Sequence, residues 1–135
     1  MKKLFSTKYT DRSVTVSLFL LRFAVGGLMI THGYDKLIHF SQLSSGFADP
    51  FHIGSTLSLS LSLFAEFFCA AMLVLGLLTR FAAIPLIIDM IVALYYVHHW
   101  HFTGEGEKAS LYLAGFIAIA FTGPGKFSLD RLIGK

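Results

Sequence analysis

The pattern of hydrophobic and polar positions divides the chain into four apolar runs separated by short polar stretches. The runs cover about residues 14–37, 57–78, 81–100 and 109–122. A helix needs about 20 apolar residues to cross about 30 Å of hydrocarbon, so three runs have the length of a span and the fourth is short. Residues 41–56 and 101–108 are polar and are expected to form loops. The pattern predicts an all-α fold, with residues 1–135 forming one domain, a four-helix transmembrane bundle.

The beginning of the second run has a pattern that is also typical of a strand. Residues 57–63 (LSLSLSL) alternate apolar and polar positions with period two. An unpaired strand would leave its backbone amides and carbonyls without partners inside a bilayer. A helix is therefore expected here, with the serine hydroxyls bonding back to the preceding turn or facing a neighbouring helix.

The first run carries a polar stripe along one helical face. An arginine about two turns inside a span costs about 2.5–3.5 kcal/mol on insertion scales, so this face should pack against protein rather than lipid. Two glycines on the stripe would let another helix approach closely. The residues of the stripe are Arg22, Gly26, Met29, Gly33 and Lys36.

Composition and charge place the chain in the membrane and predict its orientation. It is 55% hydrophobic and 14% charged, with a mean hydropathy of +0.69. The net charge of +3 does not indicate nucleic-acid binding, because the basic residues lie at the ends of the apolar runs, next to lipid headgroups. By the positive-inside rule both termini are cytoplasmic and the loops 41–56 and 101–108 face outward. The residues that decide this orientation are Lys2, Lys3, Lys8, Arg12, Arg80, Lys126, Arg131 and Lys135.

Three ionisable residues lie eight or nine positions inside the first three runs. Arg22, Glu66 and Asp89 are too deep to be left charged and alone, so we expect an intramembrane polar core in which Arg22 meets one or both acids. One reading is a structural ion pair that fixes the packing of the helices. The other is a proton or quinone site, since two acids beside one arginine would share a proton.

A second polar cluster is expected at the outer ends of the runs, formed by His32, Lys36, His99 and Glu107. The histidine spacing gives no clear set of three ligands on one helical face, so no metal site is expected. Interfacial hydration within an aromatic belt explains most of these residues. A quinone headgroup, with a histidine donating to its carbonyl oxygen, remains a second explanation.

Several ordered motifs resemble those of the DoxX family of small bacterial membrane proteins, and the resemblance covers nearly the whole chain. The motifs are Arg22 with Gly26, His32-Gly33-x-x-Lys36-Leu37, Glu66, Leu75-Gly76-Leu77-x-Thr79-Arg80, Glu107 and Gly123-Pro124-Gly125-x-x-Ser128-Leu129-Asp130. The resemblance implies a multi-pass four-helix bundle in the bacterial inner membrane. It also implies a link to thiosulfate:quinone oxidoreductase and to complexes that handle oxidative stress.

The terminal motif also has a mechanical interpretation. Gly123, Pro124 and Gly125 would end the fourth run, and Ser128 would cap a short following turn. Asp130 would then reach Arg80, and the two would form a structural clasp that holds the bundle closed.

Two functional hypotheses follow. The first is a membrane subunit of a quinone-linked oxidoreductase. With one cysteine, Cys69, the chain cannot form a dithiol relay, so such a subunit would need a redox partner, and its cofactor would be a quinone rather than a group built into the chain. The second is a non-catalytic assembly protein, or a binder or carrier of a small lipophile. The sequence leaves both the catalytic role and the oligomeric state open.

Overall fold

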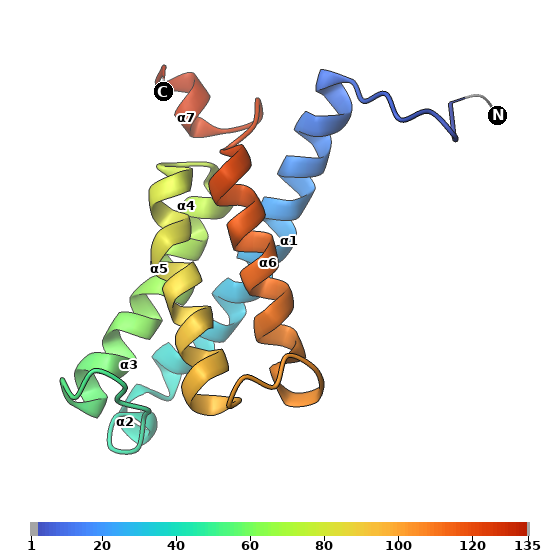
Figure 1. Cartoon of the computed structure of the whole chain (residues 1–135). Coiled ribbons are helices and arrows are strands. Elements are labelled where there is room, and N and C mark those ends of the chain that lie inside the picture. The colour runs from blue at the N-terminus through green and yellow to red at the C-terminus, as the bar shows by residue number, and fades with distance from the viewer. Residues whose placement is uncertain (1–2, 135) are drawn as a thin grey trace.

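The computed structural model describes residues 3–134, and every regular element within this range is helical (Figure 1). The elements include two π-helical turns, η1 and η2, and one 3₁₀ turn, η3. In chain order they are α1 (Asp11–Ile38), α2 (Phe40–Leu43), α3 (Ser55–Leu63), η1 (Phe64–Cys69), α4 (Ala70–Leu75), α5 (Thr79–Val92), η2 (Ala93–Val97), η3 (Gly104–Gly106), α6 (Glu107–Thr122) and α7 (Leu129–Leu132).

Within residues 3–134, three continuous helical segments are long and apolar enough to cross a membrane: Asp11–Ile38, Ser55–Leu75 and Thr79–Val97. The run predicted over 109–122 forms α6, which at 16 residues is shorter than these three and packs mainly against α5 and also against α1. The LSLSLSL stretch is helical, as expected of a segment that must satisfy its own backbone. Both described chain ends lie at the same end of the molecule as the α4–α5 turn (Figure 1).

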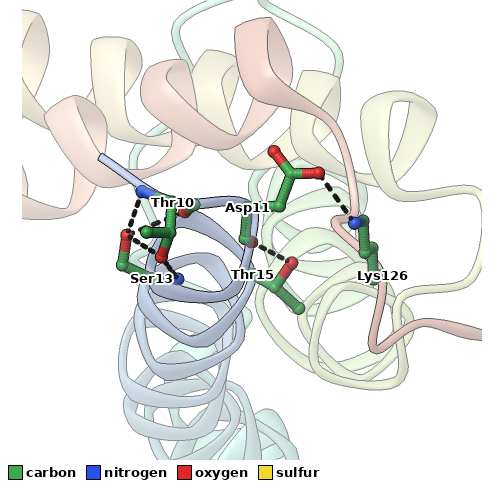
Figure 2. A network of polar contacts seen from close by, with 5 residues as sticks. All are labelled: Thr10, Asp11, Ser13, Thr15 and Lys126. Atoms are coloured by element: carbon green, nitrogen blue, oxygen red, sulfur yellow. Dashed lines mark hydrogen bonds and ion pairs between the residues drawn. The ribbon is translucent and has the colours of Figure 1, made fainter. Parts of the chain in front are cut away.

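Helix α1 begins three residues earlier than the apolar pattern predicts because a polar cap extends it. Thr10 and Ser13 form a capping box, in which the Ser13 amide donates to Thr10 Oγ1 at 3.1 Å and the Thr10 amide donates to Ser13 Oγ at 3.0 Å (Figure 2). Lys126 Nζ lies 3.1 Å from Asp11 Oδ2 in the same view. Both side chains are exposed, so this pair connects the chain ends only weakly.

The turn between α4 and α5 is held by Asp130. Gly76 has a φ of +70° and Leu78 a φ of +46°, so the chain reverses through two left-handed residues, and α4 ends before the predicted Leu78. The Asp130 carboxylate accepts hydrogen bonds from the Leu78 amide at 2.7 Å, the Thr79 amide at 2.9 Å and the Thr79 hydroxyl at 2.9 Å. Its negative charge thus satisfies the free amides at the start of α5.

The predicted clasp involves the α4–α5 turn, and Asp130 has backbone partners there that were not predicted. Asp130 reaches the turn and accepts hydrogen bonds from Leu78 and Thr79, and Arg80 Nη2 donates to the Phe121 carbonyl at 3.3 Å. The free amides of a helix start point along its axis toward the Asp130 carboxylate, and the exposed Arg80 side chain reaches the end of α6. The sequence did not indicate that the amides of Leu78 and Thr79 would also bind Asp130.

Arg22 belongs to the same end of the molecule. Its side chain is 1% exposed, its guanidinium donates to the Phe127 carbonyl, and the charge of Asp130 attracts it. It packs against Gly76, where a Cβ would overlap the guanidinium. The segment after α6 is thus fastened to both α1 and the α4–α5 turn.

Close contact between α1 and η1 sets the position of the polar residues near the other end. A Cβ on Gly33 would lie 2.7 Å from the Phe67 amide nitrogen and 2.8 Å from the Glu66 carbonyl carbon. These are backbone atoms, which cannot move aside as a side chain can. Only glycine allows this approach, and it brings the turn of α1 that carries Lys36 against Glu66.

We predict that Asp130→Asn lowers the free energy of unfolding by about 1.5–3 kcal/mol. The asparagine side chain has one acceptor oxygen, whereas the carboxylate uses two. The substitution also removes the negative charge that attracts Arg22. Thermal unfolding in mild detergent would measure the loss. Asp11→Asn, at an exposed carboxylate, is the control and should leave the melting temperature unchanged. An equal loss in both variants would contradict the role given to Asp130.

We predict that Gly33→Ala destabilises the protein by about 1–3 kcal/mol, because the methyl group must push α1 away from the η1 backbone. Gly27→Ala is the matched control, since a Cβ at Gly27 would meet no atom within 4 Å. The control should be neutral or slightly stabilising, as alanine favours a helix over glycine. Urea or thermal unfolding of the two variants in the same detergent would decide, and equal stabilities would disprove the close contact.

Candidate functional site

The centre of the candidate site is an ion pair between α1 and η1. Lys36 Nζ lies 2.6 Å from Glu66 Oε2, and it also donates to Ser62 Oγ at 2.9 Å. The Glu66 side chain is 6% exposed and the Lys36 side chain 21% exposed. A charge-assisted contact of this length between two largely buried groups fixes both side chains in place.

Asp89 of α5 completes the cluster. Its carboxyl group lies beside the Glu66 carboxyl and near the Ser62 side chain. Three helical segments thus contribute one group each to a cluster of two acids and one base, supported by a serine from α3.

A π-helical turn places Glu66 in this cluster. The turn η1 interrupts the α-helical pattern between α3 and α4, and a second one, η2, interrupts α5. A π-turn adds a residue to the helical turn and changes which side chains face the neighbouring helix, and such turns are frequent at functional sites. Residues from both π-turns line the same cavity. The apolar runs of the sequence are unbroken at these positions and did not indicate the π-turns.

The cluster lies in a cavity of about 530 Å³, referred to below as the Lys36 pocket. Its walls are largely apolar and come from the ends of α1 and α5, from α3 and η1, and from the loop between α2 and α3. The lining residues are Lys36, Phe47, Ala48, Pro50, Phe51, Ile53, Ser58, Leu61, Ser62, Phe64, Ala65, Glu66, Pro85, Ile88, Asp89, Val92, Ala93 and Val97. This combination of apolar walls and a few convergent polar groups is typical of a small-molecule site.

The loop over residues 44–54 closes one side of the pocket and is itself anchored. Asp49 accepts hydrogen bonds at 2.9 Å from the Ile53 amide, the Gly54 amide and the Ser58 hydroxyl. Although desolvation opposes it, these bonds together hold the pKa of the Asp49 carboxyl below its ordinary value. Tyr96 of η2 donates to the Pro50 carbonyl at 3.3 Å and joins the loop to α5.

The predicted polar core of Arg22, Glu66 and Asp89 is wrong in one member. Glu66 and Asp89 do meet, but their cation is Lys36, and Arg22 lies with the carboxyl-terminal segment. The Cα–Cβ bonds of a helix tilt toward its amino terminus. Arg22 therefore extends away from the acids, whereas Lys36 extends from the end of α1 back toward them. Counting depth along each span could not distinguish these directions.

The predicted outer cluster does not form as one group. Lys36 enters the pocket, and His32 is exposed on α1 with its ring 5.9 Å from that of Tyr112. His99 is exposed in the turn after η2, and Glu107 is exposed at the start of α6. Among residues 3–134, no three histidine, cysteine or acidic side chains are grouped closely enough to hold a metal ion.

The sequence analysis missed the loop residues of the pocket and the supporting role of Ser62. Phe47 lies with its ring centroid 5.5 Å from Lys36 Nζ, and Phe51 and Ile53 add further apolar wall. No local pattern marks these positions, because their role depends on how the loop folds back over α3. The spacing of Gly33 and Lys36 on the polar stripe was the one sequence signal that Lys36 would face a neighbouring helix.

Comparison with known proteins places this arrangement in a family. A model of the DoxX family matches residues 17–99. An uncharacterized membrane protein of Mycobacterium tuberculosis is 30% identical to the chain over 134 residues, covering 88% of this chain and 82% of its own length. The Escherichia coli inner membrane protein YphA is 30% identical over 128 residues, covering 86% of this chain and 89% of its own. No solved structure matches the chain. Because the family model covers more than half of its length, the chain belongs to the DoxX family of membrane proteins.

Proposed function

We propose that this membrane protein binds a small lipophile in the Lys36 pocket, with the polar head of the ligand against the Lys36–Glu66–Asp89 cluster. The observation that carries the proposal is a set of ionisable groups facing a largely apolar cavity of about 530 Å³. That volume is within the range of about 300–1,000 Å³ found for small-molecule sites.

The cost of burying the cluster supports a role beyond packing. Buried ion pairs are often no more stabilising than apolar residues of similar volume, because desolvation offsets the attraction. A second acid, Asp89, adds to that cost without adding a second cation. Ionisable residues within membrane spans are by default candidates for a functional site.

Three exposed residues of the pocket wall indicate where a ligand would enter. Leu61, Phe64 and Ile88 line the pocket and are 52%, 48% and 49% exposed. All three lie within the segments that are apolar enough to span a membrane. A ligand dissolved in the bilayer could therefore enter between α3 and α5, with its tail remaining in lipid.

A quinone is one lipophile that the site would fit. Its carbonyl oxygens accept hydrogen bonds, and the Lys36 ammonium and a proton on the acid pair are donors at the wall of the pocket. In the topology proposed from the charge distribution, with cytoplasmic termini and α6 as a fourth span, the pocket lies toward the outer face. A quinone-linked redox role extends the proposal and requires a partner subunit to supply electrons.

We predict that Ala93→Phe empties the pocket of its ligand. Ala93 lines the cavity, so a phenyl ring there occupies the space that the ligand needs. Bound small molecules would be extracted from the purified protein and identified by mass spectrometry. We expect a lipophile near one per chain in the wild type and at least tenfold less in the variant.

Ala118→Phe is the matched control, because Ala118 is exposed on α6 and does not line the pocket. It should retain the lipophile. A ubiquinone analogue with a decyl tail, titrated into each protein, tests the quinone directly through the rise in melting temperature. The proposal fails if only bulk phospholipid is extracted and no lipophile raises the melting temperature of the wild type.

A further inference from the structure

The Lys36 pocket contains one more acid than base. Lys36 lies 2.6 Å from Glu66 and can balance one negative charge. Asp89 lines the same cavity, with its carboxyl group beside that of Glu66. Two adjacent carboxyl groups with one ammonium between them hold one proton, because each negative charge opposes ionisation of the other group. The cluster is therefore neutral while it holds that proton and carries one negative charge when the proton leaves.

Other ionisable groups near the cluster leave this count unchanged. On α6, Tyr112 lies close enough to Glu66 to interact with its charge. On α1, His32 faces the charge of Lys36 and packs its ring against Tyr112 at 5.9 Å. A phenol and an exposed imidazole beside an ammonium are both expected to be neutral near pH 7.

The walls suit a positively charged, apolar ligand. Phe47, Phe51 and Phe64 line the cavity, and the Lys36 ammonium already lies 5.5 Å from the Phe47 ring centroid. Aromatic faces attract cations, most strongly where water is excluded. An anionic head would instead meet a carboxyl pair whose neighbouring ammonium is already engaged by Glu66 and Ser62.

Resting on the lipophile pocket proposed above, we propose that the pocket binds a lipophilic organic cation in exchange for the proton shared by Glu66 and Asp89. The step breaks one carboxyl O–H bond and releases the proton to water. The positive charge of the ligand takes its place, so the net charge of the pocket stays at zero. No oxidation, reduction or covalent bond to the ligand is involved.

The full chain in dodecyl maltoside provides the test. Tetraphenylphosphonium would be titrated in weakly buffered solution while heat and pH are recorded, and tetraphenylborate, of nearly the same size and opposite charge, is the matched probe. We expect binding of the cation with release of about one proton per site. The apparent affinity should rise by about tenfold per pH unit until the acid pair has lost its proton.

Asp89→Asn removes the exchangeable proton and leaves the Lys36–Glu66 pair neutral. It should weaken cation binding at least tenfold and abolish both the proton release and the pH dependence. Asp35→Asn is the control. Its carboxylate is next to Lys36 in sequence, but the side chain is 70% exposed and lies 3.2 Å from His39, outside the pocket. This variant should bind as the wild type does.

The outcomes separate the two proposals, and the titrations of the wild type decide even if a variant fails to fold. Binding of both probes alike, or cation binding without proton release, would overturn the exchange. Binding of the decyl quinone without binding of the cation would overturn it too, while the lipophile pocket would stand. If neither the cation nor the quinone binds and extraction yields only phospholipid, both proposals fail.

Discussion

A charged side chain among apolar helices needs an opposite charge or a hydrogen-bond partner within reach, because desolvating an unpaired ion costs several kcal/mol. In this protein the contact between Lys36 and Glu66 at 2.6 Å meets that need. It requires α1 to approach the η1 backbone so closely that Gly33 has no room for a Cβ. The close packing of α1 at Gly33, the π-turn at Glu66 and the wall of the cavity all come together at this contact.

The buried charged side chains have different surroundings at the two ends of the molecule. At the end that holds the described termini, Arg22, Asp130 and the α4–α5 turn are joined by hydrogen bonds to backbone groups. The side chains of Arg22 and Ser128 pack so closely around Gly76 that a Cβ there would overlap them. At the other end the charged groups face a cavity instead. One end of the molecule is thus closely packed, and the other end contains a cavity.

The residue range that the family model matches includes the whole Lys36 pocket but not Asp130. All residues that line the Lys36 pocket lie between Lys36 and Val97, inside the matched range 17–99. Asp130, which holds the α4–α5 turn, lies outside that range. The relatives from Mycobacterium tuberculosis and Escherichia coli align over most of both chains. The segment recognised by the family model is thus the segment that builds the cavity.

The sequence by itself determined the helical class, the membrane environment and the family, because apolar length and the need to satisfy the backbone leave few alternatives in a bilayer. It also identified Glu66, Asp89 and Lys36 as groups that need partners. Only the tertiary structure decided which groups meet. Side chains of α1 tilt toward its amino terminus, so Lys36 reaches the acids and Arg22 turns away from them. Direction along a helix and the path of the loop over α3 are properties of the packed chain, and no local pattern of residues records them.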